Sequence, residues 1–176
     1  LWYPDETIQH AGIVTGLGGY AGHSHKYKKK GGSGYLFRTS TVQDFSGVTG
    51  ACLLVKTAVY DEMHGLDEQF AVAFNDVDFC LRVRDAGYRI AWTPYAELIH
   101  YESKSRGGDE KDPVKAARFA AEQQRLYTIH GKENILDDPY YNPNLTRDRE
   151  DFSESDDLRR LKEGRVTVRF RGGTLQ

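Results

Sequence analysis

Two carboxylates separated by one residue are the clearest candidates for chemistry in this sequence. Asp76 and Asp78 flank Val77 in the stretch "FNDVDFC", directly after the apolar run "FAVAF". If a helix begins with Asn75 as its N-cap, Asp78 takes the third helical position and can reach back to the cap as in a capping box. Asp76 then takes the first position, where its side chain need not cap anything.

The spare carboxylate of Asp76 is the candidate general base. The helix dipole favours the ionised form of both acids, and an ionised acid at a helix start is well placed to accept a proton from a hydroxyl. The same dipole weakens it as a base, so catalysis would need further groups. We expect Asp78 to start the helix and Asp76 to be available for chemistry.

His100 is a second candidate, at the end of the strand-like stretch "AELIH". A polar loop with Glu102, Ser103, Ser105 and Arg106 follows it. A histidine where a buried strand opens into a polar loop can present a ring nitrogen to a metal or a phosphate. A plain histidine at a strand end remains the alternative.

The segment after residue 15 is rich in Gly, His and Lys. Gly16, Gly18 and Ala21 match the spacing of a dinucleotide-binding loop, but no helical pattern follows, so we reject that interpretation. His23 and His25 have no carboxylate or cysteine partners at a recognisable zinc spacing. We expect residues 15–34 to form a long loop with solvated His and Lys, whose lysine run at 26–30 could also steer an anionic substrate or a lipid surface.

The remaining pattern mixes strands and helices, as α/β or α+β folds do. Strand patterns occur at both sides of a turn at 4–7, at 35–50 and 51–56, around Pro94, and at 166–170. Helices are expected at 58–64 with Thr57 as cap and Gly65 as stop, from Asn75 to the stop at Gly87, and at 113–130 with Asp112 as cap and Gly131 as stop. We expect residues 137–157 to wrap the surface or to be mobile.

The composition fits a soluble globular protein. The 176 residues are 39% hydrophobic and 28% charged, and the formal net charge of -2 gives no argument for nucleic-acid binding. No apolar run approaches the roughly 20 residues that span a bilayer. The two cysteines, Cys52 and Cys80, lie in apolar segments, so we expect two reduced core thiols rather than a disulfide.

Several stretches in order resemble the bacterial family 2 glycosyltransferases of cell-surface polysaccharide and rhamnan-type synthesis. These stretches are "YPDETIQHAGIVTGLGG", "GVTGACLLVK", "HGLDEQFAVAFNDVDFCLRVRDAGYRIAWTPYAELIHYESKSRG" and "DPYYNPNL". The resemblance covers about residues 1–150. It implies a GT-A fold, which is a Rossmann-like α/β domain with a mixed sheet that transfers sugar from a nucleotide donor with a divalent metal, Mg²⁺ or Mn²⁺.

The resemblance also assigns roles to residues. The family's acidic pair, usually Glu-Asp, corresponds to Asn75-Asp76, which makes Asp76 the general base and Asn75 a departure without charge. The segment lining the substrate pocket corresponds to Thr49 and Gly50. The C-terminal metal-binding histidine corresponds to His100, and Arg106 in the following loop is a candidate for the donor phosphates, with weaker support for Ser103 and Lys104.

The half that binds the nucleotide comes first in this family and ends in an Asp-x-Asp metal motif, and we see no such half before Leu1. We therefore expect residues 1–150 to be the acceptor-side part of a longer glycosyltransferase, inactive alone, and 151–176 to be an acidic linker with a strand-like extension. The expected partners are a nucleotide-sugar donor and a hydroxyl or glycan acceptor. The expected location is the cytoplasm, either free or peripheral at the inner face of the membrane. A non-catalytic glycan- or partner-binding module and a nucleotidyltransferase remain alternatives.

Overall fold

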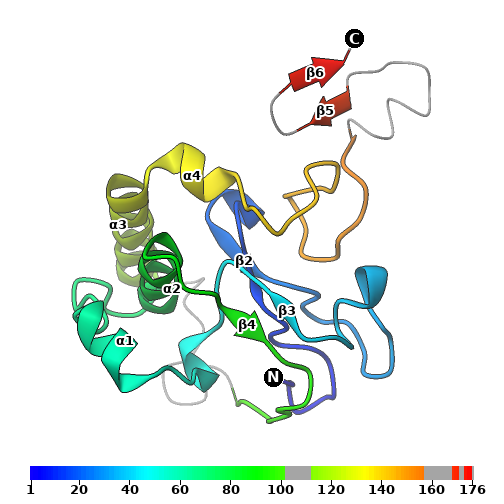
Figure 1. Ribbon diagram of the computed structural model, residues 1–176, viewed down its shortest axis with the longest axis horizontal. Helices are drawn as coiled ribbons and strands as arrows, with labels where there is room; N and C mark the ends of the chain where they lie inside the picture. The colour runs from blue at the N-terminus through cyan, green and yellow to red at the C-terminus, as the bar shows by residue number, and fades with distance from the viewer. Residues whose placement is uncertain (102–111, 157–167, 171–172, 176) are drawn as a thin grey trace.

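The computed structural model describes residues 1–101, 112–156, 168–170 and 173–175, and it combines helices with short antiparallel strands (Figure 1). The α-helices are α1 (Thr57–Glu62), α2 (Asn75–Asp85), α3 (Pro113–His130) and α4 (Lys132–Leu136). The 3₁₀ helices are η1 (Leu17–Gly19), η2 (Tyr35–Phe37) and η3 (Gly50–Cys52). The strands are β1 (Ile13–Thr15), β2 (Ala21–His23), β3 (Gln43–Asp44), β4 (Ala91–Trp92), β5 (Val168–Phe170) and β6 (Gly173–Leu175).

Each of the three sheets in the described ranges has two antiparallel strands. They pair β1 with β2, β3 with β4, and β5 with β6. A single bridge between Ile13 and Gly47 brings the segment that leads into η3 alongside β1. The mixed α and β content agrees with the predicted class, while the larger mixed sheet of a GT-A domain is not formed among these residues.

Helix α2 is at the centre of the fold because two of its faces are buried. Val77 and Leu81 pack with Ile13 and with residues of α3 and α4, where Leu126 and Ile135 are fully buried. The other face packs against α1 and β4 in a separate cluster of Val59, Phe79, Cys80, Val83 and Ile90. Figure 1 shows α2 lying beside α3 with α1 next to it. This double packing fixes the start of α2 in space.

Helix α3 confirms its predicted cap and stop, while α1 and α2 each have an N-cap one residue before the predicted one. Asp112 caps α3 as expected, since its Oδ1 accepts a hydrogen bond from the Val114 amide at 2.9 Å, and Gly131 follows the helix. The N-cap of α2 is Phe74 rather than Asn75, and α1 begins at Thr57 with Lys56 as its cap. Phe74 has a positive φ of 65° and is buried against Tyr20 and Phe119. Packing of this ring, not a polar cap, determines where α2 begins.

Three expectations for loops and strands are wrong. Residues 51–56 are not a buried strand: η3 occupies their start and Leu54 is fully exposed. Residues 15–34 are not one long loop, because β2 pairs with β1 there. The segment 137–156 is not merely a surface wrap, since Tyr141, Leu145 and Phe152 pack with Val14 and Phe45 in the core. In each case the long-range packing partner overrides the local pattern.

The expected boundary after residue 150 remains a prediction, although Phe152 lies beyond it and belongs to this packed cluster. The predicted strand near the C-terminus is present as β5, which forms a hairpin with β6. Across the described parts of the chain, none of the helices combines the length and apolar character needed to cross a bilayer.

Candidate functional site

The candidate site is built on residues 47–50, which we call the anchored segment because a different contact holds each residue. The residues at 47 and 49 are held from the N-terminal side: the Ile13 amide donates to the Gly47 carbonyl at 2.8 Å, and the Thr49 amide donates to His10 Nε2 at 3.3 Å. The residues at 48 and 50 are held from α2: the Val48 amide donates to Cys80 Sγ at 3.5 Å, and the Gly50 amide donates to Asp76 Oδ2 at 2.8 Å. The alternation follows from extended backbone, in which successive residues face opposite sides.

The carboxylate of Asp76 is held by two backbone donors and is still partly exposed. Its Oδ2 accepts from the Gly50 amide, and its Oδ1 accepts from the Val77 amide at 2.8 Å. Each carboxylate oxygen has further lone pairs. The carboxylate is therefore fixed in orientation and can still accept a hydrogen bond from a hydroxyl that reaches it.

Thr49, Gly50, Asn75 and Asp76 come together, although they lie in two segments about 25 residues apart. Thr49 caps η3, with its Oγ1 accepting from the Ala51 amide at 3.4 Å. Asn75 Oδ1 accepts from the Asp76 amide at 2.7 Å, which leaves the Nδ2 amide group as a donor. A Cβ on Gly50 would lie 3.5 Å from the Asp76 Cβ, so the two backbones approach closely here.

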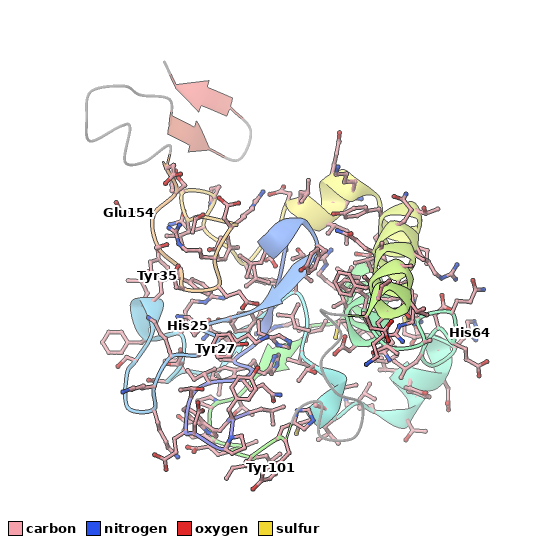
Figure 2. The ribbon with its side chains drawn as sticks, turned by 180° about the vertical axis from the view of Figure 1, so that it is seen from behind. His25, Tyr27, Tyr35, His64, Tyr101 and Glu154 are labelled. Carbon is pink, nitrogen blue, oxygen red and sulfur yellow. The ribbon has the colours of Figure 1, made fainter. Side chains whose placement is uncertain are left out.

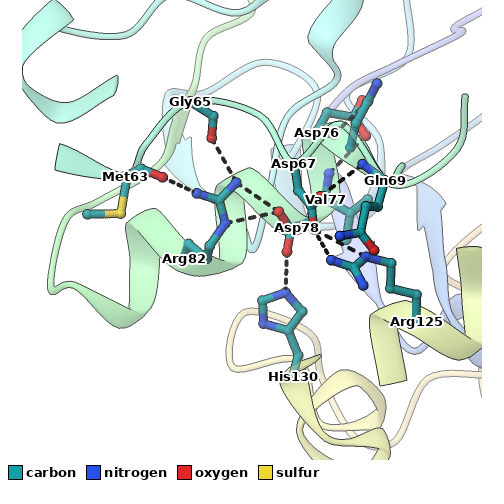
Figure 3. Close-up of polar contacts among 11 residues, drawn as sticks. Met63, Gly65, Asp67, Gln69, Asp76, Val77, Asp78, Arg82, Arg125 and His130 are labelled. Atoms are coloured by element: carbon teal, nitrogen blue, oxygen red, sulfur yellow. Dashed lines mark hydrogen bonds and ion pairs between the residues drawn. The ribbon is translucent and has the colours of Figure 1, made fainter. Parts of the chain in front are cut away.

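Asp78 has a different role from the predicted one, and the capping-box expectation is wrong. Its side chain is 1% exposed and faces α3 (Figure 3), where Oδ1 lies 2.8 Å from His130 Nε2. Its Oδ2 accepts from Arg82 Nε and Nη2 at 2.9 and 2.8 Å, and the same guanidinium donates to the carbonyls of Met63 and Gly65. Burial raises the pKa of Asp78, but the hydrogen bonds from His130 and Arg82 outweigh it, so the net pKa is lowered.

His100 is tied to the N-terminal segment next to the site. Its amide donates to the Trp2 carbonyl at 2.9 Å, and its ring Nδ1 lies 3.0 Å from Gln9 Oε1. In a neutral ring, a proton on Nδ1 would satisfy this contact with the carbonyl oxygen and leave the lone pair on Nε2. Metal-binding histidines are commonly oriented by such a contact. Gln9 precedes His10, which binds the Thr49 amide, so His100 and the anchored segment share one support.

The other predicted ligands cannot be placed. Arg106, Ser103 and Lys104 lie outside the described residues. Among the residues that are described, there is no group of three or more His, Cys, Asp or Glu side chains that could hold a metal ion. His100 thus offers one ligand, and a divalent ion needs several convergent ones.

The sequence interpretation missed His10, which is 4% exposed and contacts both the anchored segment and His23. Its Nε2 also accepts from the Gly12 amide at 3.3 Å, and its Nδ1 lies 2.9 Å from His23 Nδ1. The sequence contains an indication of this contact, because His10 lies in a largely apolar stretch. Its neighbours Ile8, Ala11 and Ile13 are all buried. A titratable side chain within such a stretch indicates a buried polar contact.

The expectation of solvated histidines at 23 and 25 is wrong for His25, which is fully buried. Its Nε2 accepts from the Tyr35 amide at 2.9 Å, so its Nδ1 carries the proton toward Ser24 Oγ at 2.6 Å. The ring stacks on Phe152 with 4.2 Å between centroids, and Figure 2 shows His25 between Tyr27 and Tyr35. Burial and the charges of Lys28 and Arg38 lower the pKa of His25 to about 4.

The two thiols also differ. Both cysteines are free, as expected, but only Cys80 is a core thiol, and Cys52 is exposed in η3. Burial raises the pKa of Cys80 to about 11, against the opposing hydrogen bond with Val48. Cys52 is consequently an accessible site for chemical labelling, two residues from Gly50.

Comparisons with known proteins find relatives over much of the chain. It is 49% identical over 153 residues to an uncharacterized protein, y4gI, of Sinorhizobium fredii, and 35% identical over 147 residues to the O-antigen biosynthesis protein RfbC of Myxococcus xanthus. These alignments cover 86% and 83% of this chain but only 17% and 11% of the two relatives. An N-acetylglucosaminyl-diphospho-decaprenol L-rhamnosyltransferase of Mycobacterium tuberculosis is 32% identical over 80 residues, which are 46% of this chain and 24% of that protein. No family model and no solved structure matches the sequence.

Proposed function

We propose that this chain is the acceptor-side part of a GT-A glycosyltransferase of cell-surface polysaccharide biosynthesis. The similarity to an O-antigen biosynthesis protein and to a rhamnosyltransferase supports a glycosyltransferase-like protein. The chain spans less than a quarter of the length of each relative, so the activity of the whole protein is part of the proposal. The partners would be a nucleotide-sugar donor and a glycan or other hydroxyl acceptor. The location would be the cytoplasm, including the inner face of the membrane.

One observation carries the proposal for the reaction: the 2.8 Å hydrogen bond from the Gly50 amide to Asp76 Oδ2. It joins two segments that the resemblance assigns to one substrate site, and it leaves the carboxylate partly exposed. A base for transfer must be within hydrogen-bond reach of the hydroxyl and held in a fixed orientation. Asp76 meets the second requirement through its contacts with the amides of Gly50 and Val77.

In the proposed mechanism Asp76 accepts the proton of the acceptor hydroxyl while the hydroxyl oxygen bonds to the anomeric carbon. The bond from that carbon to the nucleotide diphosphate breaks on the opposite side, so the configuration inverts. The turn from Thr49 to Cys52 forms the floor that places the acceptor, and the Nδ2 group of Asn75 donates to a neighbouring hydroxyl. These contacts contribute through proximity and orientation.

A divalent ion, Mg²⁺ or Mn²⁺, is proposed as the cofactor of the intact protein. His100 fits one ligand position, because its Nδ1 contact with Gln9 leaves Nε2 available. An ion bound there would neutralise charge on the leaving diphosphate. Arg106 is proposed as a further contact to the donor phosphates.

An assay of the intact protein with a panel of nucleotide sugars and both metal ions tests this function. Sugar transfer to a hydroxyl acceptor is the expected result. Release of pyrophosphate without transfer would instead indicate a nucleotidyltransferase. Saturable glycan binding without turnover under any donor and metal would indicate a non-catalytic module, and either result would overturn the proposal.

A further inference from the structure

The ring of His10 has a fixed protonation pattern that follows from its neighbours. Its Nε2 faces two backbone donors, the amides of Gly12 and Thr49, each at 3.3 Å. Only an unprotonated nitrogen can accept from them, so the proton of the neutral ring is on Nδ1. That proton points to His23 Nδ1 at 2.9 Å, which must therefore be the acceptor. The contacts of the His10 ring thus agree with a neutral His10 that accepts at Nε2 and donates from Nδ1 to His23.

The histidine pair is supported from a second side. The His23 amide, at the end of β2, donates to Glu150 Oε1 at 2.8 Å. The rings of His10 and His23 meet edge to face with 5.1 Å between centroids. The His10 ring therefore also has a contact on the side of β2, through His23, in addition to its contact with the anchored segment.

The contact with Thr49 bears on Asp76 because Thr49 and Gly50 are consecutive. The Thr49 amide is bound to His10, and the next amide, that of Gly50, is bound to Asp76 Oδ2. Gly50 has no side chain to hold its own backbone, so the direction of its amide depends on the contacts of its neighbours. On the other side, Ile13 fixes Gly47 and Cys80 fixes Val48. Thr49 also accepts from the amides of Ala51 and Cys52 within its own turn, and His10 is the contact that ties this turn to the N-terminal segment.

We propose that His10 is a positioning residue, whose Nε2 lone pair fixes the turn at Thr49 and Gly50 and so orients the Asp76 carboxylate. The importance of this for catalysis rests on the proposed role of Asp76 as the base. His10 does not touch the substrate in this account. It acts through the backbone of the anchored segment.

The surroundings of His10 make its hydrogen bonds with the Gly12 and Thr49 amides sensitive to acid. The titratable groups that face it are His23 and the Leu1 amino group. Asp76 is one contact further away through the anchored segment, and His100 is one contact further away through Gln9. Glu97 lines the same small cavity of about 100 Å³ as His10. Burial lowers the pKa of His10 well below its ordinary value, and a positive charge on His23 would lower it further. A proton on Nε2 would point at two N–H donors, so both contacts would be lost together.

Hydrogen exchange of individual amides tests the proposal without any assay of activity. In His10→Leu the acceptor is removed, and the exchange rates of the Thr49 and Gly50 amides should rise about tenfold, as expected for the loss of one hydrogen bond. In His10→Gln a side-chain carbonyl stands near the position of Nε2 and should restore most of the protection. His64→Asn is the control, because His64 is exposed and lies on the far side of the molecule from His25 (Figure 2), and because Asn tolerates its positive φ of 58°. Amides in α2 such as that of Leu81 should be unchanged in all three.

Unchanged exchange at Thr49 and Gly50 in His10→Leu would overturn the proposal, and so would an equal rise at Leu81, which indicates general destabilisation. If His10→Leu does not fold, the comparison moves to pH. After correction for intrinsic exchange, the protection of the two amides relative to that of Leu81 should fall more steeply on acidification in the wild type than in His10→Gln. An identical pH dependence of amide protection in the wild type and His10→Gln would contradict the role of His10.

Turnover of the intact protein separates this proposal from the proposed function. His10→Leu should lower kcat with little change in the KM for the donor, and His10→Gln should recover it and shift the acid limb of the pH profile. Full turnover in Asp76→Asn would reject Asp76 as the base, yet the exchange data would still decide whether His10 holds the turn. Transfer that depends on Asp76 but not on His10 would reject the positioning role alone.

Discussion

The carboxylate of Asp78 lies 2.8 Å from Nε2 of His130, and this contact joins the first turn of α2 to the last turn of α3. Arg82 completes the network from within α2. Figure 3 shows Asp76 at the helix start, apart from this network. Two acids that are two residues apart therefore have different tasks: Asp78 holds helices together, and Asp76 faces the anchored segment.

Replacing Asp78 by Asn should destabilise the protein by about 2–4 kcal/mol, because it leaves a partly buried guanidinium and the His130 ring without their charged partner. Urea unfolding measures the change. Asp85→Asn is the control on the same helix, since Asp85 is 63% exposed and its change should be within about 0.5 kcal/mol. Equal effects of the two substitutions would contradict the assigned role of Asp78.

Acid should destabilise the fold through its buried neutral histidines. The pKa of His25 is lowered from 6.5 to about 4, and that of His10 is also lowered, so the unfolded chain binds more protons than the folded one below pH 6.5. The stabilisation is complete above pH 6.5 and is lost as the pH falls toward 4, by about 3 kcal/mol for His25. Denaturant unfolding at several pH values measures this slope.

The substitution His25→Asn isolates the contribution of His25. Asn tolerates the positive φ of 58° at this position and does not titrate in this range. In this variant the unfolding free energy should fall less steeply with decreasing pH between pH 6.5 and 4 than in the wild type. A slope as steep as that of the wild type would show that His25 does not titrate on unfolding.

Gly12 should not tolerate a side chain. An added Cβ would lie 2.6 Å from ring atoms of Phe45, and φ is +103°. Gly31 is a matched control, because its φ is +97° and nothing lies within 4 Å of an added Cβ. Gly31→Ala should cost about 1 kcal/mol of strain, and Gly12→Ala should cost about 1–3 kcal/mol more from the collision. Thermal unfolding of both variants compares them, and equal losses would mean that the ring of Phe45 moves aside.

One of the two thiols should react with a thiol reagent in the folded protein. Cys52 is exposed, while Cys80 is buried with its pKa raised to about 11, which keeps it in the unreactive thiol form. Cys52→Ser should abolish the rapid reaction, and Cys80→Ser should leave it intact. Rapid modification of both thiols without denaturant would contradict the packing of α2 against Val48.

The local sequence predicts elements well where the signal is itself local. The Asp112-Pro113 start and the Gly131 stop of α3 are confirmed, and the residues of α2 follow its apolar period. Local patterns did not predict the contacts between residues that are far apart in the sequence. Asp78 matches a capping box, but an arginine one turn along and a histidine 52 residues away compete for it and prevail. The short apolar run around Leu54 looks like a buried strand, yet no strand of the described residues pairs with it.

The resemblance proposes the residues of the candidate site, and the contacts that hold them are visible only in the structure. Thr49, Gly50, Asn75 and Asp76 were named from the resemblance, and the structure brings them together. The contacts of His10 depend on the register of residues 10–13 against residues 47–49, which no local period specifies. Whether these residues act in sugar transfer stays a prediction.

The most direct test of the central claim is the turnover of Asp76→Asn in the intact protein, with Asp85→Asn as control. If Asp76 is the base, kcat for sugar transfer in this variant falls about a hundredfold to ten-thousandfold, with donor binding unchanged, while the control retains full turnover. Transfer by Asp76→Asn at the rate of the wild type would contradict the assignment of Asp76 as the base.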